Sequence, residues 1–254
     1  MSISVTKNQS QQWPLPFVIA HRGASKLAPE NTIAALKAAK QAGSEWVECD
    51  IQLTKDNQPV IFHDTKLNRT TNGRGKLSDF TLSALQKLDA GSWFSAEFAG
   101  EKVPTLQAWL QCALTLKLKL NLELKCETKK ESILLAESVI DHLQKYWPAH
   151  SNSIFISSSN QFALMQIQER ANTLLLGLIS EKIFSEKMAA NLFQSNIISL
   201  HQPFKILNAD YVAMLHEQSL HVLAYTVNDL SVLEKLKAIG VDGVFSDNQA
   251  FYSQ

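Results

Sequence analysis

The chain has 254 residues, 45% hydrophobic and 19% charged, which is typical of a globular protein and is long enough for one α/β barrel or two smaller domains. Its 24 basic and 24 acidic residues give a formal net charge of zero, which excludes a general attraction to nucleic acid or to an anionic membrane surface. No run approaches the roughly 20 apolar residues that span a bilayer, so we expect no stable membrane insertion.

Cysteine usage and the N-terminus bear on the cellular compartment. The three cysteines, Cys49, Cys112 and Cys126, have no paired spacing, which favours a reducing environment over a disulfide framework. Residues 1–16 are polar and lack the apolar centre of a signal peptide. We therefore expect a cytoplasmic protein, whose oligomeric state the sequence does not indicate.

Short apolar runs alternate with longer amphipathic runs along the chain. The apolar runs predict strands at Phe17–His21, Trp46–Leu53, Leu118–Leu124, Ile154–Ser157, Leu174–Ile179, Ile197–Leu200, His221–Val227 and Gly243–Ser246. The amphipathic runs predict helices at Thr32–Ala42, Glu131–Lys145, Gln161–Arg170, Lys187–Phe193, Ala209–Gln218 and Leu230–Ile239, with another from about Thr105. Eight strands joined by helices predict a (β/α)8 TIM barrel. A doubly wound open sheet is the alternative, but no GxGxxG turn follows the first strand.

One stretch interrupts this alternation. The turn at residues 55–58 and the apolar run after it predict a hairpin that extends the second strand. Residues 64–103, rich in Gly, Ser, Thr and Asn, then carry only one short predicted helix, near Leu82–Leu88. We interpret this stretch as an insertion between the second strand and its helix, within a single domain spanning residues 1–254. Insertions at the C-terminal mouth of a barrel commonly shape the substrate site.

Carboxylates gather on two of the predicted strands. Glu48 and Asp50 share one face of the second strand, because successive side chains point to opposite faces. Glu123, near the end of the third strand, is expected at the same mouth of the barrel. Three hard oxygen ligands suit Mg²⁺ or Ca²⁺ better than zinc. The alternative is a salt-bridged lumen in which Lys125 neutralises one of the acids.

Two histidines end predicted strands near these carboxylates. His21 ends the first strand and His63 follows the hairpin run. The two suit an acid/base pair because imidazole titrates near neutral pH. The alternative, which is commoner for a lone histidine, is a hydrogen-bonded histidine in the core. Arg22 and Lys125 would supply positive charge for an anion such as phosphate. His201 is a further candidate for the pocket. Asn31 or Thr32 is expected to cap the N-terminus of the first helix, and we favour the capping role for Asn31.

These residues lie in motifs that together resemble the glycerophosphodiester phosphodiesterase family, most closely its bacterial cytosolic branch. The motifs are His21-Arg22-Gly23-Ala24, Pro29-Glu30-Asn31-Thr32, Glu48-Cys49-Asp50, His63-Asp64, Asn68-Arg69-Thr70-Thr71-Asn72-Gly73, Asp89-Ala90-Gly91-Ser92-Trp93, Val103-Pro104-Thr105-Leu106, Glu123-Leu124-Lys125 and Tyr225-Thr226-Val227-Asn228. Each motif alone is weak evidence, but their order and spacing together are specific. The sequence departs from the family at Ser159-Asn160, where many relatives have an aromatic residue after the serines, and at Ser246-Asp247, where Thr-Asp is usual.

The resemblance implies a metal-dependent hydrolase on a TIM barrel, with the inserted segment 64–103 covering a glycerophosphodiester substrate. Its products would be sn-glycerol 3-phosphate and an alcohol, and its cofactor one divalent cation, Mg²⁺ or Ca²⁺. By the same resemblance the metal ligands would be Glu48, Asp50 and Glu123, the general acid and base His21 and His63, and the phosphate-facing cations Arg22 and Lys125. We prefer His21 as the acid and His63 as the base, although the sequence does not order them.

Alternatives remain for the substrate and for the lining of the pocket. Hydrolysis of lysophospholipids, as by a lysophospholipase D, is a rival activity. A non-catalytic barrel that binds phosphodiesters is a rival of another class. Tyr225 and Trp93 are candidates to line the pocket, with a core or loop-anchoring role as the alternative for each.

Overall fold

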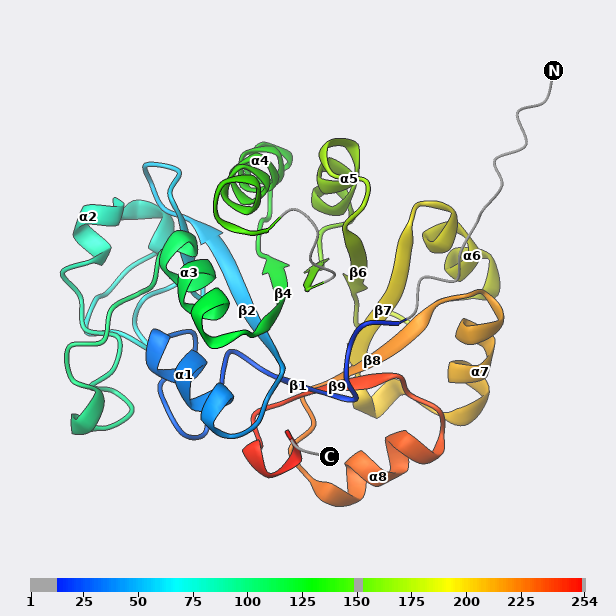
Figure 1. Ribbon diagram of the computed structural model, residues 1–254. Coiled ribbons are helices and arrows are strands. Elements are labelled where there is room, and N and C mark those ends of the chain that lie inside the picture. Colours follow the sequence, from blue (N-terminus) through cyan, green and yellow to red (C-terminus); the bar gives the residue numbers. More distant parts are fainter. Residues whose placement is uncertain (1–12, 149–152, 253–254) are drawn as a thin grey trace.

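A computed structural model describes residues 13–148 and 153–252 and contains a closed barrel of parallel strands surrounded by helices (Figure 1). The strands are β1 (Val18–Ala20), β2 (Trp46–Leu53), β4 (Lys119–Leu124), β5 (Ile154–Ser158), β6 (Leu175–Ile179), β7 (Ile197–Pro203), β8 (His221–Tyr225) and β9 (Gly243–Ser246). The helices are α1 (Ile33–Gln41), α3 (Leu106–Leu116), α4 (Lys129–Tyr146), α5 (Gln161–Arg170), α6 (Glu186–Gln194), α7 (Ala209–Glu217) and α8 (Leu230–Ala238). The predicted (β/α)8 barrel is confirmed.

The order of the strands brings distant parts of the sequence to one mouth of the barrel. Strands follow in the order β1-β9-β8-β7-β6-β5-β4-β2, and a parallel pairing of β1 with β2 closes the ring. In this register Asp50 lies opposite Glu123, and Ala20 lies opposite Ser246. The carboxyl ends of β1, β2, β4 and β9 therefore meet, and active sites of such barrels lie at that end.

Apolar side chains pack in two layers, one between the strands and the helices and one inside the barrel. Val47, Cys49 and Ile51 of β2 point outward and pack with helix residues such as Leu36 and Trp109. A separate lumen cluster includes Ile19, Trp46, Phe155, Leu223 and Phe245. The alternation expected along β2 is confirmed, because its odd positions face the helices and Trp46 faces the lumen. Glu48 and Asp50 share the lumen face with Trp46.

The segment 64–103 forms a small body of its own beside the barrel. Strand β3 (Pro59–Ile61) runs antiparallel to β2, as the expected hairpin requires. The segment then contains helix α2 (Leu82–Leu85) and two 3₁₀ helices, Leu77–Asp79 and Ala96–Phe98. Its buried apolar residues form a cluster with β3 and its flanks: Val60, Phe62, Leu67, Leu77, Leu85, Ala90 and Val103. In Figure 1 the segment lies on the side of the barrel that carries α1 and α3.

Two expectations from the sequence concern the membrane and the N-terminus. Within the described residues, every helix is too short or too polar to cross a bilayer. Residues 1–12, which hold most of the polar stretch in which we expected no signal peptide, lie outside the described residues.

Candidate active site

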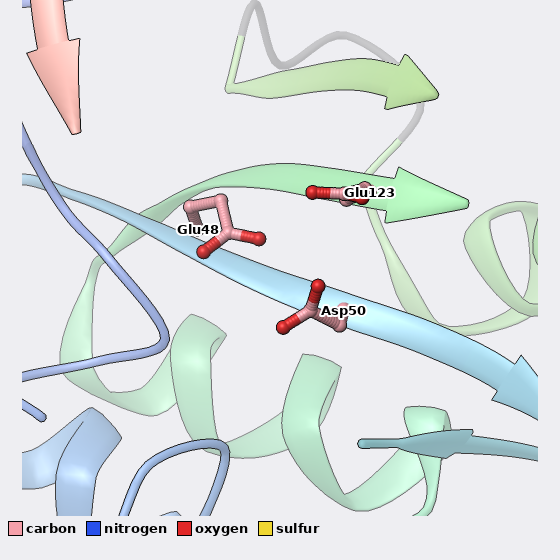
Figure 2. A group of neighbouring side chains, drawn as sticks. All are labelled: Glu48, Asp50 and Glu123. Atoms are coloured by element: carbon pink, nitrogen blue, oxygen red, sulfur yellow. The ribbon is translucent and has the colours of Figure 1, made fainter. Parts of the chain in front are cut away.

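Three carboxylates from two neighbouring strands converge at the mouth of the barrel (Figure 2). Glu48 and Asp50 come from β2 and Glu123 from β4, and one oxygen of each lies within 4.8 Å of the others. Glu48 and Asp50 are buried, with 2% and 1% of their surface exposed. Glu48 Oε1 is also buried and accepts no hydrogen bond from the described residues. A buried carboxylate oxygen without a donor is unfavourable unless a cation occupies the site.

Without a bound metal, the negative charges of these buried carboxylates repel one another. Burial raises the pKa of Glu48 well above its ordinary value, and repulsion by Asp50 and Glu123 raises it further. Burial and the charge of Asp50 also raise the pKa of Glu123. Burial also acts to raise the pKa of Asp50. The positive charges of Arg22 and Lys125 outweigh this effect, so the pKa of Asp50 is lowered. Three hard oxygen ligands gathered in this way could hold a metal ion.

Arg22 and Lys125 lie directly beside the carboxylates. Lys125 Nζ is 3.3 Å from Glu123 Oε1 and 3.5 Å from Asp50 Oδ1. Arg22 Nε is 3.4 Å from Asp50 Oδ2, and the Arg22 backbone N–H donates to Glu48 Oε2 at 2.9 Å. The salt-bridged lumen considered from the sequence is therefore present, but within the described part of the chain it leaves Glu48 Oε1 without a hydrogen-bond donor.

His21 is held at one ring nitrogen by a carboxylate from the far end of the chain. Its Nδ1 lies 2.8 Å from Asp247 Oδ1, and its Nε2 lies 4.0 Å from Glu48 Oε2. Asp247 also accepts hydrogen bonds from Ser25 Oγ at 2.8 Å and from Asn228 Nδ2 at 2.7 Å. Asp247 therefore fixes the ring through Nδ1, which leaves Nε2 as the nitrogen directed at the carboxylate cluster.

His63 is held in the same way by its neighbour in the chain. His63 Nδ1 lies 2.6 Å from Asp64 Oδ1. The side-chain amide of Gln52 fixes the turn itself, since Nε2 lies 2.8, 2.9 and 3.0 Å from the carbonyl oxygens of Phe62, His63 and Asp64. Burial lowers the pKa of His63, an effect that Arg22 and Lys125 reinforce and Asp50 opposes. His63 is therefore neutral near pH 7 and can accept a proton.

In the loop between β1 and α1, the prediction that Asn31 caps the first helix is wrong. Asn31 is not the N-cap of α1, because its backbone is left-handed, with φ of 57°, whereas an N-cap is extended. Thr32 is the N-cap, and its hydroxyl accepts from the backbone N–H of Ala35. Asn31 instead donates from Nδ2 to Asp50 Oδ2 at 2.8 Å. Gly23 has φ of 81°, and a Cβ there would lie 2.7 Å from the Cβ of Ala35, so this tight loop requires glycine.

A cavity of about 390 Å³ joins these groups. It is lined by all the candidate site residues except the deeply placed Asp50, namely His21, Arg22, Glu48, His63, Glu123 and Lys125. His201 and Tyr225 also line it, whereas Trp93 does not and donates instead to the carbonyl of Ala90. Burial lowers the pKa of His201 to about 3, so this residue is a neutral part of the cavity wall.

Several residues at the site were not assigned a role from the sequence. Asp247 holds His21, Gln52 holds the His63 turn, and Glu30 accepts a hydrogen bond from Arg22 Nη1 at 2.8 Å. In the sequence, Asp247 belongs to a departure from the family pattern and Glu30 to one of its motifs. The family pattern could have singled out Asp247 and Glu30, whereas Gln52 lies in none of the motifs and only the folded hairpin brings it to the His63 turn.

Comparisons with known proteins agree with this geometry. The sequence model of the Glycerophosphoryl diester phosphodiesterase family matches residues 21–250. The chain is 35% identical to a glycerophosphodiester phosphodiesterase of Caldanaerobacter subterraneus, over 91% of this chain and 94% of that protein. It is 32% identical to one from Bacillus subtilis, over 91% and 83% respectively. A phosphodiesterase of Oleispira antarctica, solved in complex with the product sn-glycerol-3-phosphate, superposes with a TM-score of 0.89 at 37% identity, covering 94% of this chain and 96% of that one.

Proposed function

The chain belongs to the glycerophosphoryl diester phosphodiesterase family of hydrolases, and from its site we propose that it cleaves glycerophosphodiesters to sn-glycerol 3-phosphate and an alcohol. One observation carries the proposal. Two histidines, each held at Nδ1 by a carboxylate, share a cavity with Glu48 and Glu123, two of the three converging carboxylates, and with the side chains of Arg22 and Lys125. The product named for the Oleispira antarctica phosphodiesterase supports the choice of substrate.

Glu48, Asp50 and Glu123 would hold one divalent cation, Mg²⁺ or Ca²⁺. When bound, such a cation stabilises the negative charge that builds up on the phosphoryl oxygens. The unpartnered Glu48 Oε1 and the raised pKa of Glu48 and Glu123 support this assignment. In this proposal Lys125 and Arg22 balance the remaining charge and orient the phosphate.

The two histidines move the protons. His63, neutral near pH 7, removes the proton from the attacking hydroxyl, which belongs to water or to the substrate's own glycerol. The bond from phosphorus to the alcohol oxygen breaks, and His21 protonates the departing alkoxide through Nε2. If the glycerol hydroxyl attacks, a cyclic phosphate forms, and the same two residues exchange roles when water opens it. General acid/base catalysis of this kind contributes about 10²–10⁴-fold in rate.

Product identification tests the proposal. Protein supplied with Mg²⁺ or Ca²⁺ is incubated with glycerophosphocholine, glycerophosphoethanolamine and lysophosphatidylcholine, and a coupled enzymatic assay follows glycerol 3-phosphate. We expect release from the first two substrates. Choline release from lysophosphatidylcholine alone would instead support the lysophospholipase D activity. Binding of glycerophosphocholine without turnover would support a non-catalytic barrel. The cytoplasmic location and the single-domain organisation stay predictions from the sequence.

A further inference from the structure

Arg69, in the motif Asn68–Gly73, makes four hydrogen bonds to two carboxylates beside the active site. Its Nη1 donates to Glu30 Oε2 at 2.6 Å and its Nη2 to Glu30 Oε1 at 2.8 Å. Its Nε donates to Asp64 Oδ2 and its Nη2 to Asp64 Oδ1, each at 2.8 Å. One planar guanidinium therefore binds both carboxylates in bidentate fashion, which fixes their orientation as well as their position.

Each of these carboxylates also contacts a residue that we place in the reaction. Asp64 Oδ1, which accepts from Arg69, is the same oxygen that lies 2.6 Å from His63 Nδ1. Glu30 Oε1, which also accepts from Arg69, is the oxygen that accepts from Arg22 Nη1. A continuous chain of hydrogen bonds therefore runs from Arg22 through Glu30, Arg69 and Asp64 to His63.

The backbone that carries Arg69 is itself well anchored. Leu67, two residues earlier, is fully buried in the apolar cluster of the 64–103 segment. The Thr71 hydroxyl donates to the Leu67 carbonyl at 2.7 Å and accepts from the Gly73 backbone N–H at 2.9 Å. Asn68 Oδ1 accepts from the Gly75 backbone N–H at 3.1 Å. The Arg69 guanidinium therefore extends from the packed 64–103 segment to Glu30 in the β1–α1 loop.

A purely structural role explains this arrangement poorly. The Arg69 side chain is 45% exposed, and ion pairs that open to solvent contribute little to folding stability. Its two partners are less exposed, Glu30 at 13% and Asp64 at 25%, and they contact Arg22 and His63, which line the cavity. The effect of losing Arg69 should therefore fall on the orientation of His63 and Arg22.

We propose that Arg69 is a positioning residue, which orients the base His63 through Asp64 and the phosphate-facing Arg22 through Glu30. This inference rests on the proposed function, because it assumes that His63 and Arg22 act on the substrate. It also gives the 64–103 segment a part in catalysis. Loss of a residue that orients a metal ligand typically lowers affinity or activity about 10–100-fold, and we expect a loss of the same order here.

The test compares Arg69→Ala with Arg74→Ala, a matched control. Arg74 lies in the same segment, is exposed, and forms no ion pair within the described residues. We measure steady-state hydrolysis of glycerophosphocholine with saturating cation, and thermal unfolding of each variant. We expect kcat/KM to fall about 10–100-fold in Arg69→Ala and to stay within two-fold of wild type in Arg74→Ala, with similar unfolding temperatures.

Chemical rescue separates positioning from structure. Added guanidinium at millimolar concentration should restore part of the activity of Arg69→Ala and leave Arg74→Ala unchanged, because only a planar fork can bridge both carboxylates. Arg69→Lys, which has a compact ammonium, should remain impaired. In an Asp64→Asn background, Arg69→Ala should cost less than in the wild type, because both act through His63.

Two results would overturn the inference while leaving the proposed function intact. One is an Arg69→Ala variant that keeps wild-type kcat/KM. The other is a loss that guanidinium does not restore and that is fully additive with Asp64→Asn. A wild-type protein that releases no glycerol 3-phosphate from any head group would instead overturn the proposed function.

Discussion

His21 Nδ1 lies 2.8 Å from Asp247 Oδ1, although 226 positions separate the two residues in the chain. Closure of the barrel produces this contact, because β1 pairs with β9 and places Ala20 opposite Ser246, one residue before each partner. His63 and Asp64 repeat the arrangement at 2.6 Å between adjacent residues. Both histidines therefore present Nε2 to the cavity while a carboxylate holds Nδ1.

The first prediction concerns Asp247. Asp247→Asn should lower kcat by about 10²–10⁴-fold, because the amide no longer fixes the tautomer and orientation of His21. The measurement is steady-state kinetics on glycerophosphocholine with saturating cation. Asp242→Asn is the matched control, since Asp242 accepts from His221 Nδ1 at 2.9 Å and from His216 Nε2 at 2.8 Å at the opposite end of the barrel. Equal losses in the two variants would argue against a role for the His21–Asp247 pair in catalysis.

The second prediction concerns pH. Burial lowers the pKa of His63 below its ordinary 6.5, so this imidazole, the base in our proposal, stays neutral to lower pH. At saturating cation, kcat/KM should therefore fall on the acidic side only below pH 6.5. Asp64→Asn removes a negative charge that raises the pKa of His63, so the acidic limb should move to still lower pH while the rate decreases. An acidic limb that moves to higher pH in this variant would contradict the assignment of His63 as the base.

The third prediction concerns the stability of metal-free protein. The pKa of Glu48 is raised in the folded state, so its ionisation favours the unfolded state as the pH rises above the ordinary value of 4.5. Glu48→Gln removes this cost and should raise the unfolding temperature of chelator-treated protein at neutral pH, by roughly 2–4 °C per kcal/mol gained. The same variant should lose cation-dependent activity.

A pH series separates this effect from ordinary surface changes. The gain from Glu48→Gln should grow as the pH rises above 5, and Glu97→Gln, which changes an exposed acid in the 64–103 segment, is the surface control. A clear loss of stability in metal-free Glu48→Gln at pH 8 would show that the carboxylate is a structural anchor.

Much of the site could be predicted from local patterns. The period of two along Trp46–Leu53 puts Glu48 and Asp50 on one face, and the end of the next strand supplies Glu123. The barrel register places Asp50 directly opposite Glu123, as a ring of parallel strands with aligned mouths requires. His21 follows β1 at this mouth, and the antiparallel return of β3 brings His63 beside Asp50, whose carbonyl accepts from the Phe62 backbone N–H at 2.9 Å.

The supporting contacts could not be predicted in this way. Asp247 meets His21 only because the barrel closes, and Arg69 meets Glu30 only because the 64–103 segment folds back onto the β1–α1 loop. Asn31 was misassigned for a related reason. Both Asn31 and Thr32 suit an N-cap by residue type, and the choice depends on backbone angles that a tertiary contact with Asp50 favours.

The most direct test of the whole account is cation-dependent release of glycerol 3-phosphate from glycerophosphocholine. Wild-type protein is stripped with chelator, assayed, and assayed again after Mg²⁺ or Ca²⁺ is restored, beside His21→Ala and His63→Ala. We predict no activity without cation, recovery on adding one of the two cations, and a loss of at least about 10²-fold in each histidine variant that retains its fold. Full activity in excess chelator, or near-wild-type activity in either histidine variant, would contradict the account.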